Sequence, residues 1–292
     1  RGKDKFLPHM LGHEGTGKVI AVGNRKSNFK KNDKVFLSWI KNNNKKNNKI
    51  IFDSSNGKKR INAGPITTFS NYTLVAENRV YKLPKNISLK QGVLLGCALP
   101  TGAGMVFNQS NNIKTKSVLV IGSGGIGIAV ILALISKGVK KIFVYEKNKN
   151  KIKVLKKYFP YLICYYKFEK IKNKNFFFDY VYECSGNAKN IKLGFNLIKN
   201  DGKCIFASHP EHNKKIILNP HDLIKGKKIE GSWGGKINFN KHLKLLLNLI
   251  KKFKFIEKLY FNKVYSLPSI NKAINDFKKG KNIRALIKFS NE

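Results

Sequence analysis

The segment LPHMLGHEGTGKVIAVG, residues 7–23, places a histidine next to a carboxylate at His13 and Glu14, with Gly12, Gly15 and Gly17 around them. An imidazole beside a carboxylate in a tight turn can bind a metal ion, act as a general base or lie in a solvated loop. The local sequence does not choose between these three roles. An alternating apolar stretch follows the pair and predicts a β-strand.

A glycine-rich turn is the second feature with chemical meaning. Gly122, Gly124 and Gly127 follow the apolar stretch VLVI and open the apolar segment IGIAVILALI, with Gly125 and Ile126 inside the same turn. In a dinucleotide-binding unit, the first glycine permits the turn, the second lets the backbone approach the pyrophosphate, and the third lets the helix pack on the strand. The pattern therefore predicts a cofactor site with the phosphates at the helix N-terminus.

An acidic residue is expected about 20 positions further on, and Glu146 lies 19 residues after Gly127, at the end of the next predicted strand. Its carboxylate can accept hydrogen bonds from the ribose hydroxyls and would repel a 2′-phosphate, which favours NAD over NADP. Three positively charged residues follow Glu146 and act against the preference for NAD: Lys147, Lys149 and Lys151.

The elements that position these residues predict an α/β fold in two parts. Short strands at GKVIAVG, DKVFLSW, TFSNYTLVA and NRVYKLP form a β-rich part up to about residue 90. Strands and helices then alternate, which implies a doubly wound parallel sheet of the Rossmann type. After residue 235 we expect a helix at HLKLLLNLIKKF, a strand at KVYSL, a helix at INKAINDFKKG and a strand at RALIKF. We predict a β-rich domain from residues 1–98 and 236–292, and a nucleotide-binding domain from residues 99–235.

Composition narrows the class of protein. The 292 residues, 42% of them hydrophobic, suffice for two domains. The longest apolar run, residues 126–135, is too short to cross a membrane. The net charge of +42 comes almost wholly from Lys, together with abundant Asn, Ile, Phe and Tyr, all of which have A/T-rich codons. Genome composition explains the charge, so we expect no specific nucleic-acid partner. The Lys/Asn tract at residues 41–49 is predicted to be a mobile surface loop.

The four cysteines, Cys97, Cys164, Cys184 and Cys204, show no paired close spacing, which fits a reducing compartment. We therefore expect the protein in the cytoplasm.

The motifs GHEGTGKVIAVG, NDKVF, TFSNYTLV, GCALPTGAG, IGSGGIG and NIRALIKF occur in the same order as in the medium-chain, zinc-dependent alcohol dehydrogenases. The chain resembles that family over nearly its whole length. The resemblance implies a GroES-like catalytic domain joined to a Rossmann domain, with the active site in the cleft between them. It also implies hydride transfer between an alcohol or polyol and NAD, giving an aldehyde or ketone, in a homodimer or homotetramer.

By this resemblance, His13 and Cys97 match two of the three protein ligands of a catalytic zinc, and Glu14 matches the acidic residue beside the metal. Imidazole and thiolate suit Zn²⁺, and an open coordination position would accept the substrate oxygen. Four further residues match positions around the cofactor: Thr101 near the nicotinamide, Ile126 on its far side, Lys151 at the ribose and Arg284 at the pyrophosphate.

The sequence departs from the family pattern in two places. Many relatives bind a structural zinc through four clustered cysteines after the strand that matches DKVFLSW, whereas residues 40–64 contain no Cys, so we expect no structural zinc. The remaining catalytic ligand, a Cys, and the hydroxyl residue that relays the proton would lie before Arg1. We therefore expect an N-terminally truncated sequence that, as given, binds zinc poorly or is inactive.

Other interpretations stay open. His13 could be an ordinary turn histidine, Glu14 an exposed turn acid, and Cys97 a buried thiol. The chain could be a zinc-free quinone or enoyl reductase of the same superfamily, a nucleic-acid-binding protein with a redox fold, or an inactive remnant. The remaining histidines and cysteines are expected to be structural or surface residues: His9, His209, His212, His221, His242, Cys164, Cys184 and Cys204.

Overall fold

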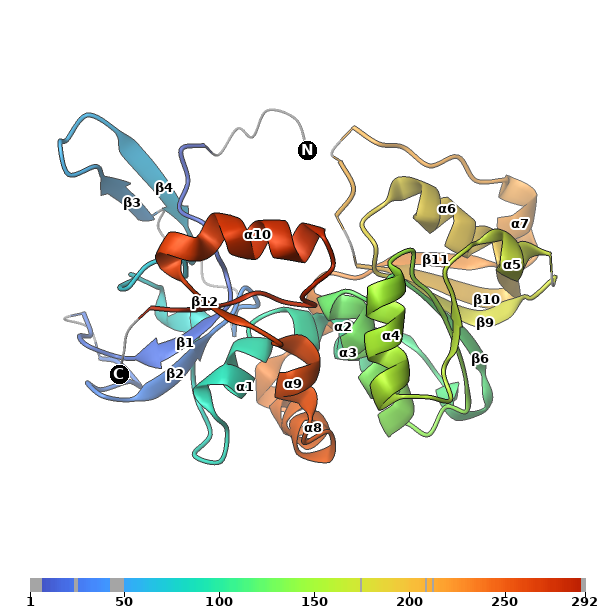
Figure 1. The fold of residues 1–292 in the computed structure, drawn as a ribbon, viewed down its shortest axis with the longest axis horizontal. Helices are drawn as coiled ribbons and strands as arrows, with labels where there is room; N and C mark the ends of the chain where they lie inside the picture. Colours follow the sequence, from blue (N-terminus) through green and yellow to red (C-terminus); the bar gives the residue numbers. More distant parts are fainter. Residues whose placement is uncertain are drawn as a thin grey trace.

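The computed structural model describes residues 7–23, 26–42, 50–173, 175–207, 209–211 and 213–289. Figure 1 shows a large sheet with its helices at one end of the molecule and the smaller sheets at the other, with α10 (Ile270–Lys278) over the middle. Residues 43–49 of the predicted Lys/Asn loop lie outside the described residues. Within the described part of the chain, no helix is both long enough and apolar enough to cross a membrane.

The large sheet has six parallel strands in the order β11-β10-β9-β6-β7-β8. The strand order changes direction between β6 and β9, and ligands of open α/β sheets bind at the carboxyl ends of the strands at such a point. This sheet confirms the predicted Rossmann fold class. The strands are β6 (Ser117–Ile121), β7 (Lys141–Tyr145), β8 (Ile163–Tyr165), β9 (Phe178–Glu183), β10 (Ile198–Phe206) and β11 (Lys228–Gly231).

Helices cover both faces of this sheet because its central strand is apolar on both sides. Val118 and Val120 of β6 belong to one hydrophobic core, whereas Leu119 and Ile121 belong to a second. Gly138, at φ 77°, follows the end of α3, as predicted. The helices of this region are α2 (Ala98–Gln109), α3 (Gly125–Ser136), α4 (Lys149–Tyr158), α5 (Glu169–Lys172), α6 (Ala188–Asn196), α7 (Pro220–Ile224) and α8 (Phe239–Lys252).

The β-rich part contains a three-stranded antiparallel sheet in the order β1-β2-β5, a hairpin of β3 and β4, and a parallel pair of β12 and β13. Short helices connect these strands to the rest. The strands are β1 (Gly15–Lys18), β2 (Lys34–Leu37), β3 (Ile50–Asp53), β4 (Arg60–Gly64), β5 (Val80–Lys82), β12 (Val264–Ser266) and β13 (Leu286–Lys288), and the remaining α-helices are α1 (Leu89–Leu94) and α9 (Ile256–Tyr260). Single 3₁₀ turns lie at η1 (Glu77–Arg79), η2 (Ile113–Thr115), η3 (Gly234–Lys236) and η4 (Leu267–Ser269).

Two predicted strands differ from the structure. The alternating stretch GKVIAVG, residues 17–23, is a strand only at its start, because β1 ends at Lys18 and Ile20 is 61% exposed. The second predicted strand is absent. TFSNYTLVA, residues 68–76, contains no strand. The apolar side chains that suggested one point to solvent, with Tyr72 75% and Leu74 63% exposed. The backbone of this segment bonds elsewhere instead, since the N–H groups of Thr68 and Phe69 both donate to the carbonyl of Leu11. The segment is therefore a loop packed against the residues just before His13.

The predicted domain boundaries stay a prediction. Side chains of α8, such as Leu246, and of α9, such as Leu259, belong to the same hydrophobic core as Val118 of β6 and Ile131 of α3. Contacts across residue 236 are therefore apolar and extensive.

Candidate active site

The glycine turn between β6 and α3 has the geometry that the fingerprint predicts. Gly122 adopts φ 87° and its N–H donates to the carbonyl of Tyr145 at 2.8 Å. A Cβ at Gly127 would lie 1.9 Å from the carbonyl oxygen of Gly122, so only glycine fits there. A Cβ at Gly124, by contrast, would meet no atom within 4 Å. The open space at Gly124, at the N-terminus of α3, fits a pyrophosphate.

Glu146 lies directly after β7 and is only 6% exposed. One of its carboxylate oxygens, Oε2, accepts hydrogen bonds from the N–H and the Oγ of Ser123, both at 2.9 Å. The other, Oε1, accepts the N–H of Asn148 at 2.9 Å. The acidic residue of the fingerprint is therefore bonded to the glycine turn itself, through a serine that the sequence analysis did not single out.

The other predicted cofactor residues lie on the helices around this turn. Lys151 is in α4, with Nζ 5.8 Å from the ring centroid of Phe277 in α10. Ile126, in the first turn of α3, is partly buried, and a Cβ at Gly102 would lie 2.3 Å from its carbonyl oxygen. Thr101, the residue before Gly102, is buried in α2. The structure thus brings Ile126 and the helix turn of Thr101 together.

The His13–Glu14 pair packs against the residues that precede α2. A Cβ at Gly96 would lie 2.8 Å from Cβ of Glu14, and the N–H of Ala98 donates to Oε2 of Glu14 at 3.3 Å. Cys97 lies between these two residues at the N-cap of α2. Burial raises the pKa of the Cys97 thiol, and a hydrogen bond with Thr101 opposes that rise. The side chain of Glu14 is 7% exposed, so Glu14 is a buried acid and not an exposed residue of a turn.

His13 is half exposed, with Nε2 4.0 Å from Oε1 of Glu14. Partial burial of the ring and the charge of Arg284 both lower the pKa of the imidazole. A neutral imidazole is the form that binds a metal ion. Its ring packs edge-on against Trp39, with 6.0 Å between the ring centroids.

Arg284 joins the two predicted sites. Its guanidinium forms an ion pair with Oε1 of Glu14, which is 7% exposed. Its Cδ would lie 2.9 Å from a Cβ at Gly125, in the glycine turn. Burial lowers the pKa of Arg284 to about 10, so the side chain is charged at neutral pH. The predicted pyrophosphate residue thus lies beside the first residue of α3 and also holds the acid next to His13.

The imidazole of His13 and the thiol of Cys97 are of the types that bind zinc, but they are fewer than the three protein ligands of a catalytic zinc site. A catalytic zinc takes three protein ligands, usually His, Cys or carboxylate. The described residues contain no group of three His, Cys, Asp or Glu placed to hold a metal ion. Glu14 is already bonded to Arg284 and Ala98. The role of His13 and Cys97 as zinc ligands therefore stays a prediction.

A row of neighbouring aromatic rings beside His13 was not predicted from the sequence. The Trp39 ring lies 6.4 Å from that of Trp233, and Trp233 lies 5.5 Å from His209. Trp233 is 66% exposed despite its size. These residues are far apart in the sequence, and no local motif marks them.

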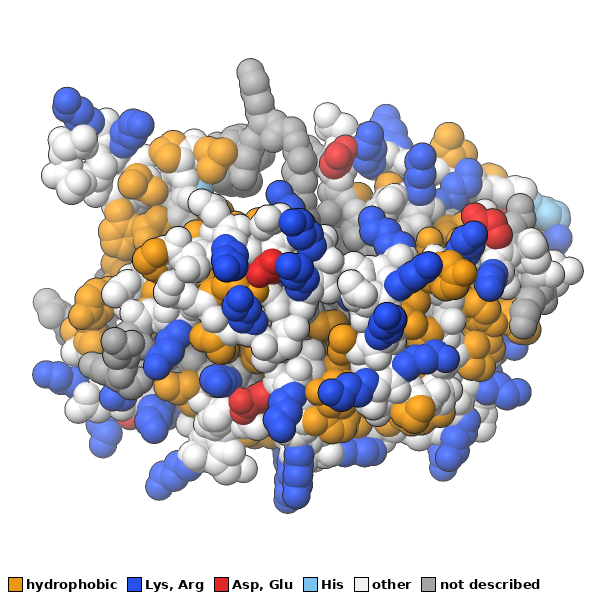
Figure 2. Space-filling model, viewed as in Figure 1, with side chains coloured by type: hydrophobic (Ala, Val, Ile, Leu, Met, Phe, Trp, Pro, Cys, Tyr) orange, Lys and Arg blue, Asp and Glu red, His pale blue; other side chains and the backbone are white. Residues whose placement is uncertain are grey.

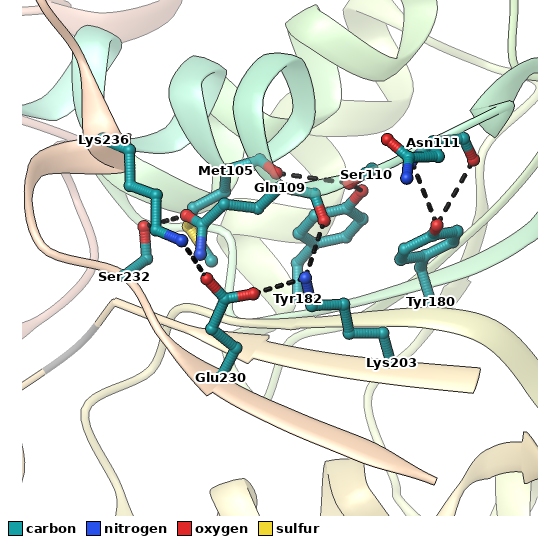
Figure 3. A network of polar contacts seen from close by, with 10 residues as sticks. All are labelled: Met105, Gln109, Ser110, Asn111, Tyr180, Tyr182, Lys203, Glu230, Ser232 and Lys236. Carbon is teal, nitrogen blue, oxygen red and sulfur yellow. Dashed lines mark hydrogen bonds and ion pairs between the residues drawn. The ribbon is translucent and has the colours of Figure 1, made fainter. Parts of the chain in front are cut away.

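The far end of α2 is fixed by a polar network, shown in Figure 3. Oε1 of Gln109 accepts the hydroxyl of Ser232 at 2.5 Å, and Glu230 forms ion pairs with Lys203 and Lys236. Burial raises the pKa of Glu230, but hydrogen bonds from Lys203 and Lys236 outweigh it and lower the pKa to about 2. The helix that begins at Cys97 is thus attached to β10 and β11 at its other end.

Comparison with known proteins agrees with this arrangement. Residues 2–85 match the family described as alcohol dehydrogenase GroES-like domain, and residues 125–252 match zinc-binding dehydrogenase. The chain is 27% identical to alcohol dehydrogenase class-3 of Drosophila melanogaster, covering 97% of this chain and 84% of that protein. It is 26% identical to S-(hydroxymethyl)glutathione dehydrogenase of Photobacterium damsela subsp. piscicida, covering 97% and 85%.

Among solved structures, benzyl alcohol dehydrogenase from Acinetobacter calcoaceticus has the same fold, with a TM-score of 0.82 at 24% identity over 97% of this chain and 85% of that one. The matching domains, their order and the glycine turn lead to one conclusion. The chain belongs to the medium-chain zinc alcohol dehydrogenase-like family.

Proposed function

We propose that this protein is an NAD-linked alcohol oxidoreductase, which transfers a hydride between an alcohol or polyol and the nicotinamide to give an aldehyde or ketone. The observation that carries the proposal is the position of Arg284. It contacts the glycine turn at Gly125 and forms an ion pair with Glu14, next to His13. A cofactor bound at the turn would therefore have its reactive end close to the His13–Glu14 pair.

Each residue has a role in this proposal. Gly124 leaves room for the pyrophosphate, and Arg284 contributes positive charge beside it. Glu14 fixes the start of α2 by accepting the N–H of Ala98, and this orients Cys97. A zinc ion held by His13 and Cys97 would supply Lewis-acid polarisation of the substrate oxygen.

The test is a titration of the purified protein with NADH, followed by fluorescence, and then an assay for NADH formation with primary, secondary and polyhydric alcohols. We expect NADH binding, and we expect metal content to fall in Cys97→Ser but not in Cys164→Ser, which removes a thiol from β8 instead. Failure to bind NADH would refute the cofactor assignment. If the wild-type protein carries zinc, equal zinc content in the two variants would refute Cys97 as a ligand.

The described residues bring no three zinc donors together, so one alternative stays open, a zinc-free quinone or enoyl reductase on the same fold. Such a protein would oxidise NADH or NADPH with a quinone or an enone and would not oxidise alcohols. It would also contain less than about 0.2 zinc per chain after purification without chelator. Metal analysis together with the two assays separates the alternatives.

A further inference from the structure

The serine inside the glycine turn makes a contact that the fingerprint does not require. Ser123 lies between Gly122 and Gly124 and is fully buried. Its N–H and its hydroxyl both donate to the same oxygen of Glu146, at 2.9 Å each. The fingerprint leaves this position free, so the contact is a property of this chain.

These bonds determine how Glu146 can receive a ribose. A carboxylate has about four acceptor positions on its two oxygens. Three are filled by protein donors, two from Ser123 and one from the N–H of Asn148. One position on Oε1 remains for a ribose hydroxyl.

The same bonds oppose a 2′-phosphate. Lys147 and Lys149 are exposed beside Glu146 and would attract a phosphate if the carboxylate could turn away. Glu146 is 6% exposed and held by Ser123 on one oxygen and by Asn148 on the other. A charge that cannot turn away repels the phosphate at close range, where solvent screens little.

We propose that Ser123 is a specificity-determining positioning residue, which holds the Glu146 carboxylate toward the cofactor ribose and so selects NAD(H) over NADP(H) in spite of the neighbouring lysines. The inference rests on the proposed function, because it concerns the cofactor of that reaction. The preference for NAD over NADP, which the sequence pattern links to Glu146 alone, would then depend on the Ser123 hydroxyl as well.

The test compares the dissociation constants of NADH and NADPH, measured by cofactor fluorescence, so neither substrate nor metal is needed. The main variant is Ser123→Ala. The matched control is Ser117→Ala at the opposite end of β6, where the N–H and the Oγ of a serine both donate to Oδ2 of Asp179 at 2.8 Å. Both variants lose one serine–carboxylate hydrogen bond, but only one of them lies at the turn.

We expect the wild-type protein to bind NADH more tightly than NADPH, and Ser123→Ala to reduce that preference about tenfold, as the loss of a hydrogen bond to a charged group implies. Ser117→Ala should keep the wild-type preference. Glu146→Asp provides a second variant should Ser123→Ala fail to fold, since the shorter side chain withdraws the carboxylate from Ser123 while keeping its charge. It should lose the preference as well.

A folded Ser123→Ala or Glu146→Asp variant with a preference within about twofold of wild type would overturn the inference and leave the proposed function intact. An equal loss in Ser117→Ala would also overturn it, since the effect would then be general destabilisation. Wild-type protein that binds neither nucleotide would overturn the proposed function and this inference together.

Discussion

Replacing Glu230 by Gln tests whether the network at the end of α2 stabilises the fold. In the structure, the Glu230 carboxylate forms ion pairs with Lys203 from β10 and Lys236 from η3 (Figure 3). The substitution keeps the size of the side chain and removes its charge. Lys203 is 23% exposed and would then lie near Lys236 with no carboxylate between them. We expect lower stability at neutral pH.

The pKa of Glu230 gives the magnitude. It falls from 4.5 to about 2 on folding, and at 1.36 kcal/mol for each tenfold change in proton affinity this corresponds to ~3 kcal/mol. Because the carboxylate is 26% exposed, solvent screening reduces this value, and we expect a loss of roughly 1–2 kcal/mol. For a chain of this size that is a fall of about 2–3 °C in melting temperature.

The pH dependence has a definite sign. A carboxyl group whose pKa is lower in the folded protein than in the unfolded chain stabilises the fold above its unfolded pKa. The contribution of Glu230 is therefore complete above pH 4.5 and disappears as the pH falls toward about 2. The difference between wild type and Glu230→Gln should be constant from pH 7 to pH 5 and shrink below that.

Thermal melting followed by circular dichroism measures this difference. Glu211→Gln is the control, because Glu211 pairs with Lys214 at 3.4 Å where both side chains are more than half exposed; we expect a loss below about 0.5 kcal/mol there. If Glu230→Gln melts within about 1 °C of wild type at pH 7, or if its deficit is the same at pH 7 and pH 3, the ion-pair reasoning is refuted.

The remaining predictions concern the candidate site. Gly127→Ala should lower the free energy of unfolding by roughly 1–3 kcal/mol and abolish NADH binding, because its Cβ would lie 1.9 Å from the carbonyl oxygen of Gly122. Gly124→Ala should melt like wild type and bind NADH more weakly, because its Cβ enters the open space in which we propose that the pyrophosphate binds; unchanged binding would contradict that placement of the phosphates. Arg284→Gln should lower the free energy of unfolding, measured by urea denaturation, by roughly 1–3 kcal/mol, because it leaves the Glu14 carboxylate buried without its cation. Adding Glu14→Gln should restore part of that loss, and a double variant no more stable than Arg284→Gln would argue against the pair.

The nucleotide-binding half could be predicted from the sequence because its signals are local. Val118 to Ile121 form a continuous apolar run that the sheet buries on both faces, and the glycines directly after it specify the turn. The β-rich half gave weaker signals. Tyr72 and Leu74 alternate with polar residues as in a strand, but both side chains face solvent. The alternation there does not mark a buried face.

Helix α2 shows why some elements could not be predicted. Its sequence, ALPTGAGMVFNQ, contains a proline and two glycines, which lower helix propensity. The glycines are needed for packing, since a Cβ at Gly102 would lie 2.3 Å from the carbonyl of Ile126 and one at Gly104 would lie 2.2 Å from the carbonyl of Gly235. Close contact with α3 and η3 therefore stabilises a helix that local propensity disfavours.

Single residues of the site could be predicted, but not their contacts. His13, Glu14 and Glu146 stand out by type and spacing. The ion pair of Glu14 with Arg284 joins residues at opposite ends of the chain, and no sequence period connects them. Ser123 likewise occupies a position that the fingerprint leaves free, and only the fold places its hydroxyl on Glu146.

The placement of α2 connects the chemistry that we propose at one of its ends to the packing at the other. Cys97 and Thr101 lie at the start of the helix, and Gln109 at its end is bonded to Ser232 of the segment after β11. A helix is stiff over this length, so a shift of the Gln109 end moves Cys97 as well. Gly102 and Gly104 limit such a shift, because they hold the helix in direct contact with α3 and η3. The position of the thiol relative to the glycine turn is thus determined by residues outside the set proposed to bind cofactor or substrate.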